Sequence, residues 1–285
     1  MSTEGIQGEV RDLKAKLQNY QAGSIEGLNS FKDAREGEME GMQIKVAVFG
    51  MTGVGKSSLV NTIWKVLYGK ESAPAIEQAS GGEGTQILEE FHSRSASDSE
   101  LGGFVFSDTR GFNFDFNNAE ENELFRVLYG IESSGQHLER GEWAEEMAKE
   151  AGQAAHRLKK PPLADQVHVA LWVIKGNDIR FENDQYIGKF AFVQQKLNRE
   201  GVTIVTAVTH FDKLKSKNKN EVRRKAMEVT GSSRGNTFLF ANWLPDEEDY
   251  DVQNQLEVLR MLKTALACGE RSVKSRQVLR KLDKK

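Results

Sequence analysis

Short apolar runs recur along the chain and predict the strands of a β-sheet. They occupy residues 44–49, 86–91, 104–107, 167–174, 202–208 and 237–240. Runs that are apolar on both faces are typical of strands buried within a parallel sheet, and helical stretches separate most of these runs. The pattern therefore predicts an α/β fold with helices on both faces of a mostly parallel sheet. The runs at 86–91 and 104–107 leave no room for a helix between them, which predicts that this pair is antiparallel.

Apolar residues at helical spacing occur before, within and after these runs. In the N-terminal segment, residues 1–43, they stand three and four positions apart: Ile6, Val10, Leu13, Leu17 and Tyr20. We favour one amphipathic helix lying on the domain over a coiled coil, because a coiled coil needs three or four sustained heptads. Residues 112–162 read as a helical insertion, with helices expected near 122–129 and 143–158. A last core helix is expected from residue 249 onward.

These features predict an N-terminal helical segment (1–43), a main domain (44–268) and a basic C-terminal tail (269–285). The formal net charge of −3 gives no indication of nucleic-acid binding. The single cysteine, Cys268, fits a reducing compartment, and the polar N-terminus lacks a hydrophobic signal segment, so we expect a cytoplasmic protein. We interpret the basic tail as a solvated helix end. Docking of the tail on an acidic partner or on anionic lipid is the alternative.

A glycine-rich stretch follows the first predicted strand. Residues 50–57 read GMTGVGKS, which fills every fixed position of the pattern G-x-x-x-x-G-K-[ST], and a helical stretch comes next. In this strand–turn–helix setting the N–H groups of the turn and of the helix N-terminus bind the phosphates of a nucleotide. Lys56 is expected to reach the β- and γ-phosphates, and Ser57 to hold Mg²⁺. The predicted phosphate-binding residues are Gly50, Thr52, Gly53, Val54, Gly55, Lys56, Ser57 and Ser58.

Two later segments are expected to complete the phosphate side of this site. Residues 108–111 read DTRG, a D-x-x-G motif at the end of the third predicted strand. Asp108 is expected to meet Mg²⁺ through water, and the N–H of Gly111 to sense the γ-phosphate. Thr85, at the end of the glycine-rich stretch 80–85, is the expected second Mg²⁺ ligand in a loop that closes over the γ-phosphate. The candidate catalytic residues are thus Lys56, Thr85 and Gly111, and the candidate metal ligands are Ser57, Thr85 and Asp108.

Base recognition is expected where the last two predicted strands end. Residues 209–212 read THFD, and Asp212 is placed to accept hydrogen bonds from N1–H and N2–H₂ of guanine, a pairing that adenine does not offer. Thr209 and His210 stand where the usual N-K-x-D motif has Asn and Lys, so guanine selectivity is supported without being secured. After the last strand, Asn242 is a candidate contact for guanine O6 or N7, and Trp243 either covers the base or packs in the core.

Taken together, the motifs resemble those of P-loop GTPases of the translation-factor-related class, and in detail those of the interferon-induced protein 44 family. The similarity rests on Gly50–Ser58, Gly84–Thr85, Asp108–Gly111 and Thr209–Asp212, and it spans roughly residues 44–243. It implies a three-layer Ras-like domain that binds GTP or GDP with Mg²⁺. It further implies a nucleotide-controlled switch or assembly factor in innate immunity. A homodimer across the switch face and an unidentified protein are the partners that it suggests.

Hydrolysis of GTP is expected to be slow. Small GTPases commonly place Gln directly after D-x-x-G to orient the attacking water, and this chain has Phe112 there. An arginine supplied in trans by a second protomer or a partner would raise the rate by about 10³–10⁵-fold, and Arg94 and Arg110 are candidates by position. Two other functions stay open: an ATP-using P-loop enzyme, against which Asp212 argues, and a scaffold with little or no nucleotide turnover.

Overall fold

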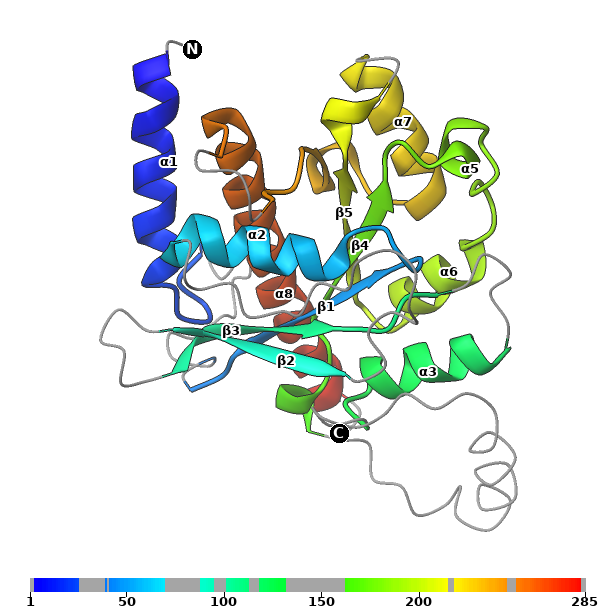
Figure 1. Cartoon of the computed structure of the whole chain (residues 1–285). Coiled ribbons are helices and arrows are strands. Elements are labelled where there is room, and N and C mark those ends of the chain that lie inside the picture. The colour runs from blue at the N-terminus through cyan, green and yellow to red at the C-terminus, as the bar shows by residue number, and fades with distance from the viewer. Residues whose placement is uncertain are drawn as a thin grey trace.

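The computed structural model describes residues 3–25, 39, 41–69, 88–94, 101–112, 118–131, 162–214, 218–244 and 250–282. Figure 1 shows the arrangement of the elements. In chain order they are α1 (Thr3–Gln18), β1 (Ile44–Gly50), α2 (Lys56–Tyr68), β2 (Glu89–Arg94), β3 (Leu101–Asp108), α3 (Asn118–Leu128), η3 (Leu163–Asp165), β4 (Val169–Lys175), α5 (Ile179–Glu182), α6 (Ala191–Arg199), β5 (Thr203–Thr209), η4 (Phe211–Lys213), α7 (Lys219–Thr230), η5 (Arg234–Asn236), β6 (Thr237–Leu239) and α8 (Val252–Leu282).

The described strands form one six-stranded sheet in the order β2-β3-β1-β4-β5-β6. The pairs β3–β1, β1–β4, β4–β5 and β5–β6 are parallel, whereas β2 runs antiparallel to β3. The predicted α/β fold, with a mostly parallel sheet and one antiparallel strand, is therefore confirmed. Strand β2 begins at Glu89, later than the apolar run at 86–91 predicts, and residues 86 and 87 lie outside the described residues.

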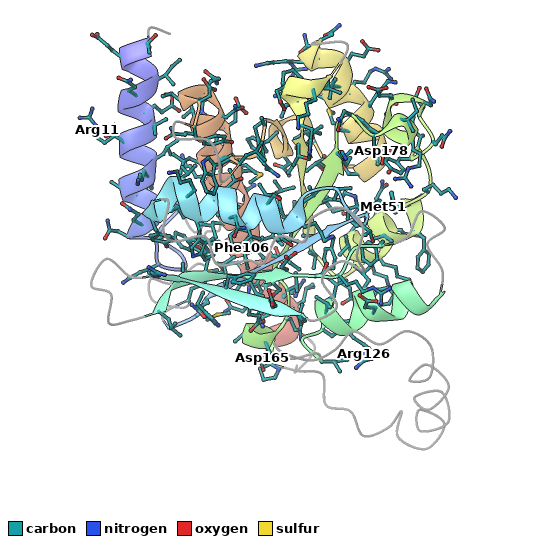
Figure 2. The ribbon with its side chains drawn as sticks, viewed as in Figure 1. Arg11, Met51, Phe106, Arg126, Asp165 and Asp178 are labelled. Carbon is teal, nitrogen blue, oxygen red and sulfur yellow. The ribbon has the colours of Figure 1, made fainter. Side chains whose placement is uncertain are left out.

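Helices α2 and α8 cover one face of the sheet. Trp64 of α2 packs edge-on against Phe104 and Phe106 of β3, with ring centroids 6.2 and 5.7 Å away, and Phe106 lies between α2 and the sheet in Figure 2. Gly269 of α8 approaches Ile44 of β1 so closely that a Cβ there would come within 2.4 Å of the isoleucine side chain. Residues of β1 and β3 that share this face therefore form the core beneath both helices.

Helices α6 and α7 cover the opposite face. Trp172 of β4 lies 6.3 Å from Phe49 of β1, ring centroid to ring centroid, and 5.0 Å from Phe190, which directly precedes α6. Thr206 of β5, which pairs with Trp172 in the sheet, hydrogen-bonds to Thr230 at the end of α7. The sheet is thus enclosed between two helical layers, the three-layer arrangement that the sequence predicts.

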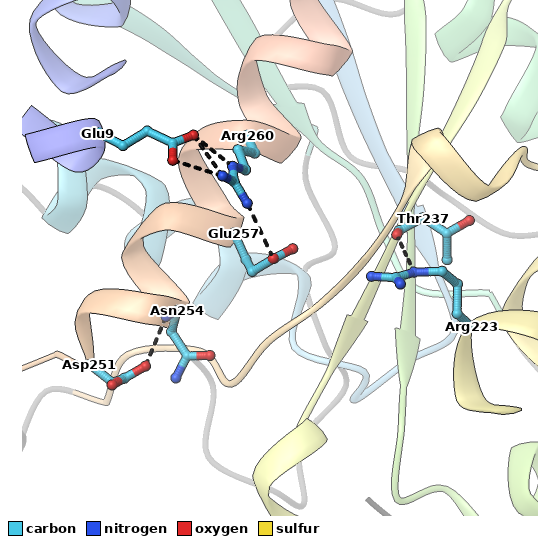
Figure 3. Close-up of polar contacts among 7 residues, drawn as sticks. All are labelled: Glu9, Arg223, Thr237, Asp251, Asn254, Glu257 and Arg260. Carbon is cyan, nitrogen blue, oxygen red and sulfur yellow. Dashed lines mark hydrogen bonds and ion pairs between the residues drawn. The ribbon is translucent and has the colours of Figure 1, made fainter. Parts of the chain in front are cut away.

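Within the N-terminal segment, helix α1 packs on the domain. The carboxylate of Glu9 on α1 accepts hydrogen bonds from both Nε and Nη2 of Arg260 on α8, at 3.0 and 2.7 Å (Figure 3). Beyond the end of α1, Tyr20 is 3% exposed and its hydroxyl donates to Glu270 of α8 at 2.8 Å. Apolar burial and charged contacts together hold α1 along α8.

Helix α8 continues to Leu282 without a break. The boundary predicted at residue 268 therefore falls inside α8. Glu270, Val273 and Lys274, which follow this boundary, are buried, so this part of α8 belongs to the core. Only further along do apolar side chains become exposed, at Val278 and Leu279. In the insertion, α3 corresponds to the helix predicted near 122–129, and the second predicted helix, 143–158, lies outside the described residues. None of the helices in the described part of the chain has both the length and the apolar character needed to cross a membrane.

Candidate functional site

The pattern G-x-x-x-x-G-K-[ST] forms the turn between β1 and α2, and we refer to residues 50–57 as the phosphate loop. Helix α2 begins at Lys56 after an N-cap at Gly55, whose φ of 90° is a left-handed conformation that glycine adopts without steric cost. No side chain caps the helix there, and the first-turn N–H groups of Lys56, Ser57 and Ser58 lack intrahelical acceptors. These N–H groups and the positive end of the helix dipole favour an anion such as a phosphate.

The D-x-x-G segment is joined directly to the phosphate loop. Phe112 N–H donates to Gly50 O, and Thr52 N–H donates to Phe112 O, each at 3.0 Å. The Thr52 hydroxyl also donates to Gly111 O at 3.1 Å. A Cβ on Gly111 would lie 2.4 Å from Cα of Thr52, so only glycine permits this approach. The two motifs predicted to hold phosphate are thus brought together, although about 60 residues separate Thr52 from Phe112.

Lys56, Ser57 and Asp108 form the charged centre of the site. Ser57 Oγ donates to Asp108 Oδ2 at 2.6 Å, and Lys56 Nζ lies 3.4 Å from Met51 O. Burial lowers the pKa of Lys56, although the charge of Asp108 opposes this shift. Burial likewise raises the pKa of Asp108, against the effects of Lys56 and of the Ser57 hydrogen bond. Burial is the leading cause of both pKa shifts. The attraction between the charges of Lys56 and Asp108 therefore does not fully offset the hydration that each side chain loses.

The oxygens of this centre suit a magnesium ion. Asp108 is 1% exposed, and its Oδ1 has no hydrogen-bond partner among the described residues. A buried carboxylate oxygen without a partner is costly unless a cation or a donor meets it. Mg²⁺ binds such oxygens, usually through one or two carboxylates and several waters. Asp108 and Ser57 therefore fit the ion and remain its predicted ligands, while Thr85 lies outside the described residues.

The ends of β5 and β6 meet the phosphate loop at Val54 and Gly55. Thr209 Oγ1 lies 3.0 Å from Val54 O and can donate to it, and Asn242 Nδ2 donates to Gly55 O at 3.2 Å. A Cβ on Gly55 would lie 3.0 Å from Asn242 Nδ2 and 3.8 Å from Cε1 of His210. The segments predicted to bind the base are therefore adjacent to the loop predicted to bind phosphate.

His210 and Asp212 stand on the solvent side of this junction. His210 has a φ of 55°, which is uncommon for a residue other than glycine, and its Nδ1 lies 3.0 Å from Thr209 Oγ1. Burial, followed by the charge of Lys175, lowers the pKa of His210, so its ring is neutral at pH 7. Asp212 lies in η4, and its side chain is exposed and accessible to a ligand. Its contact with guanine stays a prediction.

Asn242 is hydrogen-bonded to the phosphate loop. Its Nδ2 is bound to Gly55 O, whereas its Oδ1 is buried and has no hydrogen-bond partner in the described part of the chain. The amide nitrogen has a second N–H, and guanine O6 and N7 are acceptors. Asn242 thus supports the phosphate loop through one amide N–H, and its contact with guanine O6 or N7 stays a prediction, to which the second N–H is suited.

Trp243 packs in the core, which is one of the two roles open to it from the sequence. The residue is 2% exposed, and its backbone N–H donates to Thr62 Oγ1 at 3.1 Å. Lys65 Nζ lies 5.2 Å from the centre of the ring, so α2 lies next to it. A ring buried to this extent has no face to offer a base.

Phe112 and Arg94 do not point toward the phosphates. The Phe112 ring is 2% exposed and stacks on Phe49 and Trp172, each at 6.0 Å between ring centroids. Arg94 pairs with Leu101 at the far end of the β2–β3 ladder, whereas Asp108 ends β3 seven residues later, about 23 Å away at roughly 3.3 Å per residue. Arg94 therefore cannot act on the phosphate loop of its own chain.

The sequence motifs assign no role to two residues near the site. Thr109, inside the D-x-x-G segment, donates from Oγ1 to Val48 O at 2.7 Å and anchors the segment to β1. Glu89 of β2 pairs with Asp108 of β3 in the antiparallel ladder. Its position opposite Asp108 depends on the register of the two strands. A slip of one residue would turn the Glu89 side chain to the other face of the sheet, so the sequence pattern alone does not place it.

Comparison with known proteins finds a relative of similar sequence. No protein-family model matches the chain. Human interferon-induced protein 44 is 25% identical over 177 residues, a match that covers 60% of this chain and 37% of that protein's length.

Two solved structures are also similar. A probable GTP-binding protein engB has a TM-score of 0.37 and 13% identity, covering 70% of this chain and 88% of the other. A septin GTPase domain from Chlamydomonas reinhardtii has a TM-score of 0.46 and 14% identity, covering 85% and 98%. With its own phosphate loop, D-x-x-G segment and sheet order, the chain has a P-loop GTPase-like fold and resembles interferon-induced protein 44.

Proposed function

We propose that this chain is a guanine-nucleotide-binding protein with slow, Mg²⁺-dependent GTP hydrolysis. One observation carries the proposal: segments far apart in the sequence converge on the phosphate loop. Gly111 and Phe112 hold Thr52, Asp108 holds Ser57, and Thr209 and Asn242 hold Val54 and Gly55. The segments predicted to hold phosphate, metal and base therefore meet at one edge of the sheet, the edge at which ligands of open α/β folds bind.

The roles of the residues follow from their positions. The N–H groups at the start of α2 receive the phosphate oxygens, and Lys56 adds a buried positive charge. Ser57 and Asp108 would hold Mg²⁺, and the ion would neutralise charge that develops on the phosphates. Asp212, exposed near His210, is the residue proposed to select guanine. The nucleotide would thus lie from the start of α2 toward η4.

Slow hydrolysis follows from the residue after D-x-x-G. The Phe112 ring is stacked between Phe49 and Trp172, so it neither accepts a hydrogen bond from water nor reaches the phosphate side. No glutamine therefore orients the attacking water at that position. We propose that a second protomer across the switch face, or a protein partner, completes the site with an arginine. Arg110 lies within the D-x-x-G segment and is a candidate for this arginine.

The cellular role that we propose is a nucleotide-controlled switch or assembly factor in the cytoplasm. The relative with 25% identity is named for induction by interferon, which supports a role in innate immunity. The match covers 37% of that protein, so the activity of the whole relative is extended to this chain only as part of this proposal.

Nucleotide selectivity tests the proposal. A fluorescent GDP analogue bound in the presence of Mg²⁺ is displaced with GTP, ATP and XTP in turn. We expect GTP to compete at concentrations at least about tenfold lower than ATP, the equivalent of about 1.4 kcal/mol. Asp212→Asn should shift the preference toward XTP, because an amide pairs with the 2-oxo group of xanthine. The control is Asp12→Asn, the same change at an exposed position on α1. Equal competition by ATP and GTP would instead support an ATP-using enzyme.

Turnover tests the expected dependence on a second molecule. Phosphate release is followed at increasing protein concentration with saturating GTP and Mg²⁺. The proposal predicts a slow rate per molecule that rises with protein concentration or on addition of a partner. Fast turnover that is independent of protein concentration would contradict the proposal. If neither the wild type nor Lys56→Ala binds nucleotide, the scaffold function is the better explanation.

A further inference from the structure

The register of the β2–β3 ladder places a second carboxylate beside Asp108. Glu89 and Asp108 are directly paired in this antiparallel ladder, as are Phe91 and Phe106. Residues directly opposite one another in such a ladder project to the same face, with Cβ atoms about 4.5–5.5 Å apart. Glu89 is therefore a cross-strand neighbour of Asp108 at the end of the sheet where the phosphate loop lies.

The aromatic contacts show which face this is. Trp64 of α2 packs edge-on against both Phe91 and Phe106, at 6.3 and 5.7 Å between ring centroids. Since side chains two residues apart in a strand share a face, Glu89 and Asp108 both lie on the side covered by α2. The hydrogen bond from Ser57, in the first turn of α2, to Asp108 agrees with this placement.

The next residue of the same strand has a different environment. Glu90 projects to the opposite face, where its Oε1 lies 2.8 Å from Lys45 Nζ and 3.4 Å from the Ser107 hydroxyl. The charge of Glu90 is therefore matched by a lysine. Glu89 has instead a second carboxylate across the ladder, an arrangement that is unfavourable unless a cation lies nearby.

Asp108 itself requires a positive charge or a donor. One of its oxygens, Oδ2, accepts the Ser57 hydrogen bond, while Oδ1 is buried and has no hydrogen-bond partner among the described residues. Lys56 is close enough to affect the charge state of Asp108, but its Nζ is directed to Met51 O. The pKa of Asp108 is set first by burial, then by Lys56 and by the Ser57 hydrogen bond. The charge of Glu89 is a smaller cause, and it raises the pKa of the Asp108 carboxyl.

We propose that Glu89 is a second carboxylate of the Mg²⁺ site, holding water of the ion's coordination shell alongside Asp108. This inference rests on the proposed function, since the ion binds together with a nucleotide. Mg²⁺ gives up its waters reluctantly, and outer-sphere carboxylates that accept hydrogen bonds from them orient the ion. A divalent ion also removes the repulsion between the two carboxylates. Glu89 is thus a positioning residue for the metal.

The affinity for Mg²⁺ tests the role of Glu89. The wild-type chain is saturated with a non-hydrolysable GTP analogue, and its thermal unfolding midpoint is measured as MgCl₂ is titrated from an EDTA-buffered start. Glu89→Gln keeps the size of the side chain and removes its charge. Glu90→Gln makes the same change one residue away on the other face, and Glu89→Asp keeps the charge.

The expected result is a half-saturating Mg²⁺ concentration about tenfold higher in Glu89→Gln than in wild type, as for other outer-shell partners of metal sites. Glu89→Asp should recover part of this loss, and Glu90→Gln should titrate as wild type. The affinity for the analogue in EDTA should be the same in wild type and Glu89→Gln, which a merely structural role for Glu89 would not produce.

Two results would overturn the proposal, and they differ from one another. If wild type responds to Mg²⁺ and Glu89→Gln responds at the same concentration, Glu89 has no role at the metal, while the proposed nucleotide function stands. If the wild-type chain binds the analogue without any response to Mg²⁺, or does not bind it, both the role of Glu89 and the proposed function are wrong.

Discussion

The hydroxyl of Thr209 lies 3.0 Å from the carbonyl oxygen of Val54, although 155 residues separate the two. The same Oγ1 lies 3.3 Å from Ile174 O, so the residue links the ends of β4 and β5 to the phosphate loop. In the usual N-K-x-D motif an asparagine stands in this position. The shorter threonine still reaches the loop here, because β5 brings it beside Val54.

Thr209→Val should loosen the phosphate loop. The valine retains the shape of the threonine and removes the hydroxyl, leaving a buried carbonyl without its donor, which costs about 1–3 kcal/mol. We expect a lower free energy of unfolding in denaturant titration and weaker binding of a GTP analogue. Thr203→Val, at the other end of β5, is the matched control and should leave nucleotide affinity unchanged. Wild-type affinity in Thr209→Val would show that the contact does not position the loop.

Gly111→Ala should disrupt the junction between D-x-x-G and the phosphate loop. The added Cβ would lie 2.4 Å from Cα of Thr52, so the two backbone segments must separate. Overpacking of this kind costs about 1–3 kcal/mol. We expect the affinity for a GTP analogue, measured by calorimetry, to fall by about tenfold, since 1.4 kcal/mol is a factor of ten. In Gly235→Ala, where no atom lies within 4 Å of the new Cβ, affinity should not change.

His168 should make the fold sensitive to mild acid. Its Nδ1 accepts from Lys45 N–H, and its Nε2 donates to Leu163 O, each at 2.9 Å, so the buried ring is neutral. Burial lowers its pKa to about 4. Because the folded pKa lies below the unfolded value of about 6.5, the stabilisation is complete above pH 6.5 and is lost as pH falls toward 4.

The test compares wild type with His168→Asn, in which the amide oxygen takes the place of Nδ1. The variant should be less stable than wild type at pH 7 by about 1–2 kcal/mol, because the bond to Leu163 is lost. Between pH 7 and pH 4.5, however, it should lose less stability than wild type does. Parallel losses in the two proteins, measured by urea unfolding, would assign the acid sensitivity to other groups.

Tyr20→Phe should weaken the attachment of α1 to α8. The mutation removes the hydroxyl that donates to Glu270 Oε1 at 2.8 Å, while Gly23 N–H still donates to the same oxygen. Hydrogen bonds to charged groups are worth about 1.5–3 kcal/mol, and this one is buried. Faster hydrogen exchange in residues 3–25 should accompany the loss. Tyr68→Phe removes an exposed hydroxyl contact with Arg94 and should change stability far less.

Local pattern and spacing in the sequence determined the motifs of the site and the kind of sheet that carries them. The phosphate loop, D-x-x-G and T-H-x-D each follow an apolar run, and parallel strands place their carboxyl ends at one edge, so their convergence was predictable. The antiparallel strand followed from a connection too short for a helix.

Tertiary structure decided which atoms meet, because that depends on register and on packing between distant segments. Trp243 is buried beside α2, and Phe112 is stacked in the core rather than placed at the phosphates. Arg94 lies at the far end of its strand from Asp108, and Glu89 lies opposite Asp108, because the register of a ladder fixes neighbours that sequence spacing does not encode. The sequence therefore specified the parts of the proposed nucleotide site, and the tertiary structure decided which of those parts lie next to one another.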